Sequence, residues 1–265
     1  MIALIDADIL VYEAAHRSQT NIDWDQDGEA AATADFPQAC EDIQANIEFI
    51  SKKTGCDNGV LVLTDSDRDA NFRRRVWPEY KAHRGDSHTA RPLLFHAIRE
   101  WMHDNFTVKE KPGIEGDDTI GIMATGDITG LPADKQARII CSIDKDLLTV
   151  PGRHFNWRRA SEGIVTVTDD EAYYNLLYQT LCGDSTDNFP GLPGCGPVGA
   201  ERILDDASGQ SMREMWEHVV IAFEERDLSR ADALIQARCA RILQASDWDF
   251  NNDRPILWTE PEEER

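Results

Sequence analysis

Acidic residues occur in five short clusters whose internal spacing can place several carboxylates on one face. Residues i and i+2 share a face in an extended segment, and residues i and i+3 share a face in a helix. Two clusters have the first spacing and two contain the second. The clusters are Asp6 with Asp8; Asp65; Glu115, Asp117 and Asp118; Asp144 with Asp146; and Asp184 with Asp187.

Carboxylates brought within a few Å of one another raise each other's pKa values unless cations keep them ionised. Oxygen ligands without His or Cys select Mg²⁺ or Mn²⁺ over Zn²⁺. Two such ions about 4 Å apart can direct water onto a phosphodiester. Alone, the cluster at 115–118 also suits a helix N-terminus, and the cluster at 184–187 suits a turn. Only convergence of the clusters in one place would therefore indicate a metal site.

The elements that must position these acids are three short apolar runs, each ending in a carboxylate, at 2–7, 59–65 and 137–144. They have the pattern of buried parallel strands. Helical patterns lie among them at 36–53, 92–105 and 119–125. The alternation predicts an α/β fold with right-handed crossovers, in which ligands bind at the carboxyl ends of the strands.

Only helical patterns follow residue 167, at 169–182, 198–206, 212–224 and 230–244. We place a domain boundary near residue 180, which divides the chain into 1–180 and a smaller helical part at 181–265. The 265 residues include 41% hydrophobic residues, enough for a packed core.

Composition excludes several classes of protein. The six cysteines show no metal-binding spacing, which fits reduced thiols in a cytoplasm. The N-terminus has no basic leader, and no run approaches the roughly 20 apolar residues of a membrane span. We therefore expect a cytoplasmic protein with no membrane contact. The net charge of −22, taken alone, argues against nucleic acid as a partner.

Positive charge is nevertheless concentrated at 68–91, which holds seven basic and three acidic residues. Phe72, Trp77 and Tyr80 are interleaved with it and offer stacking faces for single-stranded bases. The alternative is a solvated charged face. Beside a metal site, such a segment can draw a phosphate backbone toward the ions.

A glycine-rich segment at 183–200 is the most specific string in the chain. Gly194, Gly196 and Gly199 match a dinucleotide-binding pattern, but no strand precedes them, which disfavours that interpretation. The segment instead predicts a helix, a tight hairpin and a second helix opened by Pro197. Backbone N–H groups there can bind a phosphate without reading sequence.

In combination, these motifs resemble the 5′-nuclease superfamily of flap endonucleases, bacteriophage 5′–3′ exonucleases and the 5′-nuclease domain of bacterial DNA polymerase I. The resemblance covers residues 1–204. It rests on Asp6, Asp65, PEYKAHR at 78–84, EGDD at 115–118, SIDKDL at 142–147 and GDSTDNFPGLPGCGP at 183–197. It implies a PIN-like (Rossmann-like) fold with a central, mostly parallel sheet and flanking helices. It also implies a helical arch at about 66–100 and a helix-hairpin-helix in the C-terminal part.

The resemblance further implies a two-metal site. The first ion would take Asp6, Asp65, Glu115, Asp117 and Asp118, and the second would take Asp144, Asp146, Asp184 and Asp187. Lys81 and Arg84 match arch residues that contact the scissile phosphate, and with Asp146 they form the expected catalytic set. The expected DNA-binding residues are Arg73, Arg75, Tyr80, Lys81, Arg84, Gly194, Gly196 and Gly199. Family members also bind K⁺ through hairpin carbonyls, here near 191–196.

The sequence departs from the family pattern at three places. Ile143 stands where a small residue is usual, Val198 where a phosphate-binding Lys is common, and Ala7 with Asp8 where Gly and a neutral residue are usual. Val198 suggests a weaker hold on duplex DNA. Whether Asp8 is a metal ligand stays open at this point.

The leading hypothesis is a Mg²⁺- or Mn²⁺-dependent 5′–3′ exonuclease or flap endonuclease acting in replication or in primer and flap removal. Its partner would be DNA with 5′ ends or 5′ flaps, or an RNA–DNA hybrid, and we take a monomer as the default state. A HAD-type phosphatase is the rival enzyme, because Asp6 and Asp8 follow a strand as its nucleophile motif does. A non-catalytic DNA-binding module and an acidic DNA mimic are further alternatives.

Overall fold

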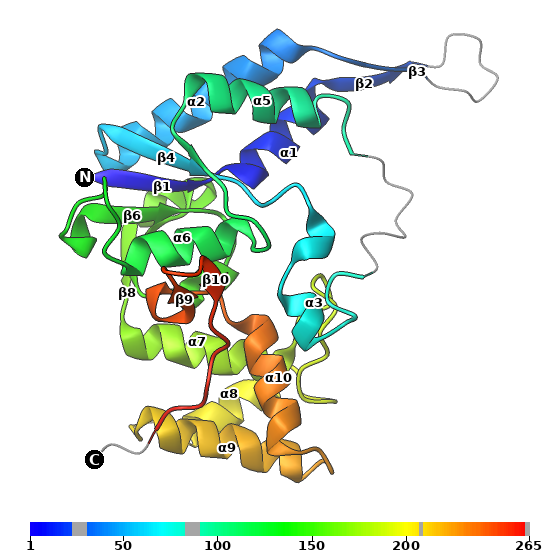
Figure 1. Cartoon of the computed structure of the whole chain (residues 1–265), viewed down its shortest axis with the longest axis vertical. Coiled ribbons are helices and arrows are strands. Elements are labelled where there is room, and N and C mark those ends of the chain that lie inside the picture. Colours follow the sequence, from blue (N-terminus) through cyan, green and yellow to red (C-terminus); the bar gives the residue numbers. More distant parts are fainter. Residues whose placement is uncertain (23–30, 83–90, 207–208, 263–265) are drawn as a thin grey trace.

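A six-stranded sheet, with strand order β5-β4-β1-β6-β7-β8, forms the centre of the protein (Figure 1). The structure is a computed structural model that describes residues 1–22, 31–82, 91–206 and 209–262. The strands of the sheet are β1 Ile2–Asp6, β4 Asn58–Val62, β5 Val108–Lys109, β6 Arg138–Cys141, β7 Gly152–Phe155 and β8 Ile164–Val167. All neighbouring pairs are parallel except β7 with β8.

The three strands predicted from the sequence are adjacent in the middle of this sheet. Strand β1 pairs on one side with β4, where Asp6 lies opposite Val62, and on the other side with β6, where Ile5 lies opposite Cys141. Because all three run in the same direction, their carboxyl ends meet at one edge. The predicted mostly parallel α/β fold is confirmed.

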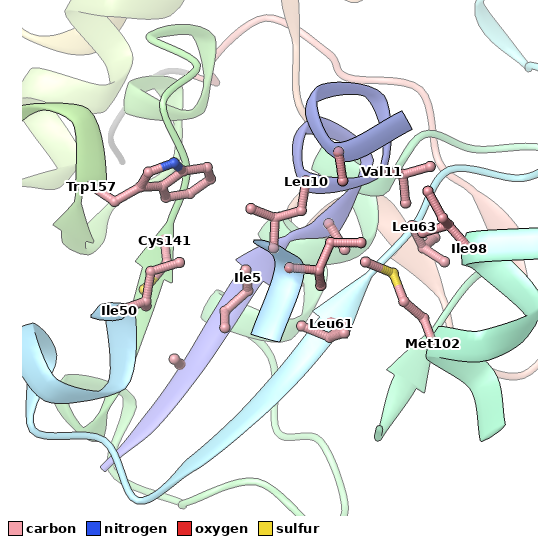
Figure 2. Close-up of a cluster of buried hydrophobic side chains, with 14 of the residues drawn as sticks. Ile5, Leu10, Val11, Ile50, Leu61, Leu63, Ile98, Met102, Cys141 and Trp157 are labelled. Atoms are coloured by element: carbon pink, nitrogen blue, oxygen red, sulfur yellow. The ribbon is translucent and has the colours of Figure 1, made fainter. Parts of the chain in front are cut away.

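Strand β1 is apolar on both faces because both faces of the sheet are covered. Ile5 packs on one face in a core with Leu10, Leu61 and Met102 (Figure 2). Leu4 points to the other face and packs with residues of α6 and β6. A strand buried on both sides has no polar alternation, which explains its near-continuous apolar sequence.

Helices α1 (Ala7–Ser18), α2 (Phe36–Thr54) and α5 (Phe95–Asn105) cover one face of the sheet, and α6 (Gly116–Thr125) covers the other (Figure 1). The short helix α3 (Arg73–Val76) lies beside the edge where the central strands end. Hairpin β2 (Gln19–Ile22) and β3 (Ala31–Ala34) projects from the end of α1.

The C-terminal helices build a second core below the sheet (Figure 1). They are α7 (Asp169–Cys182), α8 (Pro197–Asp205), α9 (Met212–Glu224) and α10 (Arg230–Ala240), and a short pair, β9 (Trp248–Asp249) with β10 (Arg254–Pro255), follows. Tyr80, from the N-terminal half of the chain, belongs to this core as well. The predicted boundary near residue 180 lies inside α7.

Several element bounds differ from the sequence prediction for local physical reasons. Helix α6 begins at Gly116 rather than at residue 119, because Glu115 caps it and accepts the first helical bonds. Helix α10 ends at Ala240 rather than at residue 244, because Leu243 beyond it donates its backbone N–H to Asp118. The strands β9 and β10 were not expected in a part predicted to be helical. In the described part of the chain, no helix combines the length and apolarity needed to cross a membrane.

Candidate functional site

Asp6 ends β1 at the edge where the central strands meet, and only 5% of the residue is exposed. Ser142, just beyond β6, donates its hydroxyl to Asp6 Oδ2 at 2.8 Å. Burial, followed by the charges of Asp8 and Asp144, raises the pKa of Asp6 to about 7. An acid at this position is therefore close to half protonated at neutral pH in the absence of a cation.

Asp117, in the first turn of α6, points toward the same place. Burial, then the charges of Asp6, Asp144 and Glu115, raise the pKa of the Asp117 carboxyl well above its usual range, and Lys81 opposes this effect. Carboxylates interact this strongly only at short range. The structure thus brings together acids from β1, α6 and the segment after β6, as the sequence predicted.

A second group of acids surrounds Asp146. Burial, followed by the charges of Asp144, Asp184 and Asp187, raises the pKa of Asp146 to about 7. Gln179 on α7 donates its amide N–H to Asp146 Oδ1 at 2.7 Å and orients the carboxylate. Asp144 raises the pKa in both groups, so the two groups adjoin one another.

The segment after α7 holds Asp184 and Asp187 in a closed turn. Asp184 pairs with Phe189 in an antiparallel bridge, and its Oδ1 accepts the Asp187 N–H at 3.1 Å. Gly183 and Gly191 touch where the turn closes, since a Cβ on Gly191 would lie 2.3 Å from the Gly183 nitrogen. Both glycines have positive φ. Only glycine meets both requirements at this crossing.

Tyr80 and Lys81 connect the two groups of acids. The Tyr80 hydroxyl lies 2.8 Å from Asp187 Oδ2 and 3.1 Å from Glu115 Oε2. Lys81 Nζ is ion-paired with Glu115 and lies 3.2 Å from Asp187 Oδ2. The Lys81 N–H also donates to the Asp187 carbonyl oxygen at 2.8 Å. Tyr80 and Lys81, which lie within the segment expected to form the arch, thus contact acids of both groups.

Two placements differ from the sequence predictions. Asp118, expected to bind a metal, is fully buried and forms a bidentate ion pair with Arg73, with both N···O distances at 2.7 Å. Arg73, expected to bind DNA, is only 2% exposed and also donates to the carbonyl oxygen of Cys239. These two residues join α3, α6 and the end of α10, and Arg73 Nη1 also lies 4.0 Å from Glu115 Oε2.

Asp65 and Asp8 have partners in the protein backbone. Asp65 Oδ2 accepts the Gly113 N–H at 2.8 Å. Asp8 Oδ2 accepts the Thr64 N–H at 2.9 Å, while its Oδ1 lies 3.3 Å from Arg99 Nη1. Asp8 therefore belongs to a hydrogen-bonded network at the rim of the site.

The other side chains expected to contact DNA differ in their exposure to solvent. Arg75 is exposed, whereas Tyr80 is 1% exposed and Phe72 is also buried, so neither ring offers a free stacking face. Arg84 lies outside the described residues.

The hairpin glycines were also expected to contact DNA. Gly194 and Gly196 are exposed before α8, where Gly196 is the N-cap residue and Pro197 begins the helix. Gly199, in the first turn of α8, is partly buried.

Sequence reasoning missed the side chains that hold the acids in place. Ser142 stands within the SIDKDL motif, two residues before Asp144 and bonded to it as well, so its position offered a signal. Gln179 lies 33 residues from Asp146, on α7 and outside every motif identified in the sequence. Asn71, which donates to Glu115 Oε1 at 3.1 Å, likewise carried no recognisable pattern.

The donor set of the site consists of carboxylate oxygens, which suits hard divalent cations. As the described side chains stand, no three acidic, histidine or cysteine residues form a ready-made metal cluster. Lys81 instead contacts Glu115 and Asp187. Ionisation of Asp6, Asp117 and Asp146 is nevertheless unfavourable, and a bound cation would stabilise their ionised forms.

Comparison with known proteins identifies similar sequences and folds. The family model described as the 5′–3′ exonuclease N-terminal resolvase-like domain matches residues 1–176. An exodeoxyribonuclease of Enterobacteria phage T3 is 27% identical, over 97% of this chain and 92% of the relative. An exonuclease of Escherichia phage T7 is 26% identical, over 97% and 93%. A T5 protein co-crystallised with metal ions has a similar fold, with a TM-score of 0.55 at 14% identity over 90% of each chain.

The different environments of Asp117 and Asp118 give a direct test of the site. Asp118→Asn should cost about 3–5 kcal/mol of stability, because it leaves the Arg73 charge buried without its partner. Asp117→Asn should leave the metal-free protein at least as stable as the wild type, because it removes a repelled carboxylate. Urea unfolding at pH 8 in EDTA measures both free energies. Similar losses in the two variants would contradict the assignment of separate roles.

Proposed function

We infer, from the premise that this chain belongs to the 5′–3′ exonuclease family through its N-terminal resolvase-like domain, that it hydrolyses DNA phosphodiesters as a structure-specific 5′ nuclease. Relatives named exodeoxyribonuclease and exonuclease, which align over 97% of the chain, support this activity. The observation that carries the proposal is the gathering of acids from separate segments at one sheet edge, with Lys81 among them.

The proposed cofactor is a pair of divalent cations, Mg²⁺ or Mn²⁺. A T5 protein and a T5 5′-exonuclease of similar fold have been crystallised with bound metal ions, zinc in the second, and the carboxylate donor set here fits Mg²⁺ or Mn²⁺. When bound, they would supply an ionised water and neutralise charge on the phosphodiester. The first would be held by Asp6, Asp65, Glu115 and Asp117, and the second by Asp144, Asp146, Asp184 and Asp187. Asp118 is left out, because its oxygens are taken by Arg73 and by the Leu243 N–H.

The proposed reaction forms a bond between a water oxygen and phosphorus and breaks the bond from phosphorus to the 3′ oxygen, which leaves a 5′-phosphate. Lys81 is the protein cation placed to stabilise negative charge that develops on the phosphate. Its ammonium group already lies among the acids, next to Glu115 and Asp187. With a phosphate and cations present, the same group can exchange these carboxylates for phosphate oxygens. Arg84, by its position in the sequence motif, would assist it.

The proposed DNA contacts come from α3 and from the start of α8. Arg75 is exposed on α3, and the exposed Gly194 and Gly196 present backbone N–H groups near the start of α8. A helix N-terminus attracts a phosphate without a lysine. A helix-hairpin-helix contact could therefore form here although position 198 is Val and not Lys. We extend the proposal to K⁺ at the carbonyls near 191–196. DNA with 5′ ends or 5′ flaps is the expected substrate, and RNA–DNA hybrids are a second one to test.

The phosphatase alternative is not favoured by the contacts of Asp8. To serve such a phosphatase as a general acid or base, Asp8 would have to be free to transfer a proton. Here Asp8 Oδ2 accepts the Thr64 N–H at 2.9 Å, and Arg99 lies against the other oxygen at 3.3 Å. A non-catalytic DNA-binding module would not need the repelling acids around Asp6 and Asp146.

Cleavage should require both divalent cations and Asp146. On a 5′-labelled flap and a nicked duplex, the wild type should release products with Mg²⁺ and none with EDTA, whereas a circular single strand, which has no 5′ end, should stay intact. Asp146→Ala should lose nearly all turnover and keep DNA affinity in a binding assay. Asp104→Ala, an exposed acid on α5, is the matched control and should stay active. Full activity of Asp146→Ala, or cleavage of a small phosphomonoester in place of the flap, would overturn the proposal.

Lys81 should act on turnover and Arg75 on binding. Lys81→Ala should lower kcat about 10²-fold, as expected for loss of one preorganised charge stabiliser, with a small change in KM. Arg75→Ala should raise KM and leave kcat near the wild-type value. Steady-state kinetics on the flap substrate separate the two parameters. A pure KM effect of Lys81→Ala would assign Lys81 to binding only.

A further inference from the structure

The Asp8 carboxylate, like that of Asp118, contacts a backbone N–H and a buried arginine. Its Oδ2 accepts the Thr64 N–H at 2.9 Å, and its Oδ1 lies 3.3 Å from Arg99 Nη1. The Asp8 side chain is 23% exposed and that of Arg99 is 9% exposed. The ion pair is therefore largely shielded from solvent, and salt screens it weakly.

Arg99, on α5, contacts the backbone of the same residue, Thr64. Its Nη2 donates to the Thr64 carbonyl oxygen at 2.8 Å and to Glu110 Oε2 at 2.8 Å. Asp8 thus holds the N–H of Thr64 while Arg99 holds its carbonyl oxygen. Both backbone groups of the residue just before Asp65 are fixed by this ion pair.

Thr64 passes this constraint on to α6. Its Oγ1 accepts the Gly116 N–H at 2.9 Å, between Glu115 and Asp117. The approach is close, since a Cβ on Gly116 would lie 3.2 Å from both Asp8 Oδ2 and the Thr64 nitrogen. A shift of Thr64 would therefore displace Asp65 and the N-terminus of α6 together.

These contacts disfavour Asp8 as a metal ligand. Each of its oxygens already accepts from a donor of the protein. A divalent cation on Oδ1 would lie within a few Å of the Arg99 guanidinium, and the like charges would repel.

We propose that Asp8 and Arg99 are a pair of positioning residues that fix Thr64, and through it Asp65 and the start of α6, for the reaction at the acidic edge. The inference rests on the proposed nuclease function for its kinetic consequence. The geometric part stands on the contacts of Thr64 alone. Residues that orient metal-binding side chains typically change affinity or activity by 10–100-fold when removed.

The first test needs no metal and no substrate. Amide hydrogen exchange of the metal-free protein, followed by NMR, should show the Thr64 N–H protected in the wild type. Asp8→Ala and Arg99→Met should each speed its exchange by about tenfold or more. Glu13→Ala is the matched control: Glu13 also lies on α1 and pairs with Arg17 and Arg158, so Thr64 exchange should not change. Unchanged exchange in Asp8→Ala would overturn the proposal.

The second test uses a double-mutant cycle on the 5′ flap. Each single variant should lower kcat about 10–100-fold, raise the Mg²⁺ concentration needed for half-maximal rate, and leave KM for DNA within about twofold. The double variant should be about as slow as the slower single one, because the two residues act as one unit. Independent, multiplicative losses would assign Asp8 its own role at the metal and overturn the pairing.

Melting curves verify that each variant is folded. If Asp8→Ala does not fold, Arg99→Met alone carries the exchange test, and Asp8→Asn, which keeps an acceptor for the Thr64 N–H but loses the ion pair, takes its place in the kinetic cycle with a loss of kcat expected. A wild type that does not cleave DNA would end the proposed function. The exchange results would still decide whether the pair positions Thr64.

Discussion

The central constraint on this structure is the mutual repulsion of carboxylates that the fold brings to one edge of a sheet. Parallel pairing of β1 with β4 and β6 makes their carboxyl ends coincide, and each of the three segments carries acids at or just beyond that end. Burial then raises the pKa values of Asp6 and Asp146 to about 7. A fold gains no stability from such an arrangement, and the cations we propose would relieve the repulsion.

Much of the surrounding structure serves to hold this unfavourable arrangement. Arg73 and Asp118 form a buried, bidentate pair that joins α3 to α6 and to the end of α10, and removal of either partner would leave a charge in the core. Tyr80 packs in the C-terminal core while its hydroxyl reaches Asp187. The same short segment, 73–81, therefore connects the two cores and the two groups of acids. The C-terminal helices therefore anchor one side of the site.

The sequence predicted what depends on periodicity and on motifs, and it missed what depends on packing. The runs ending in Asp6, Asp65 and Asp144 predicted parallel strands with converging acidic ends, because buried parallel strands leave a distinct apolar pattern. Helices α7 and α9 were predicted with their correct bounds. By contrast, EGDD gave no sign that Asp117 faces the site while Asp118 pairs with Arg73. Consecutive helical residues always point in different directions, but which of the two faces the site depends on how the helix packs. The three consecutive arginines at 73–75 look alike in sequence, yet Arg73 is buried and Arg75 exposed. The roles of Thr64, Arg99 and Gln179 required contacts across 33 or more residues.

Proton release on cation binding tests the central claim most directly. Near pH 7, Asp6 and Asp146 should each carry a proton for about half of the time in the metal-free protein, because their pKa values are raised to about 7. A cation that binds these carboxylates must displace those protons, and the release should fade as the pH rises toward 9. Calorimetric titration with Mn²⁺ in two buffers of different ionisation enthalpy counts both ions and protons. The account predicts two bound ions with net proton release at pH 7; an absence of binding, or binding without proton release, would contradict it.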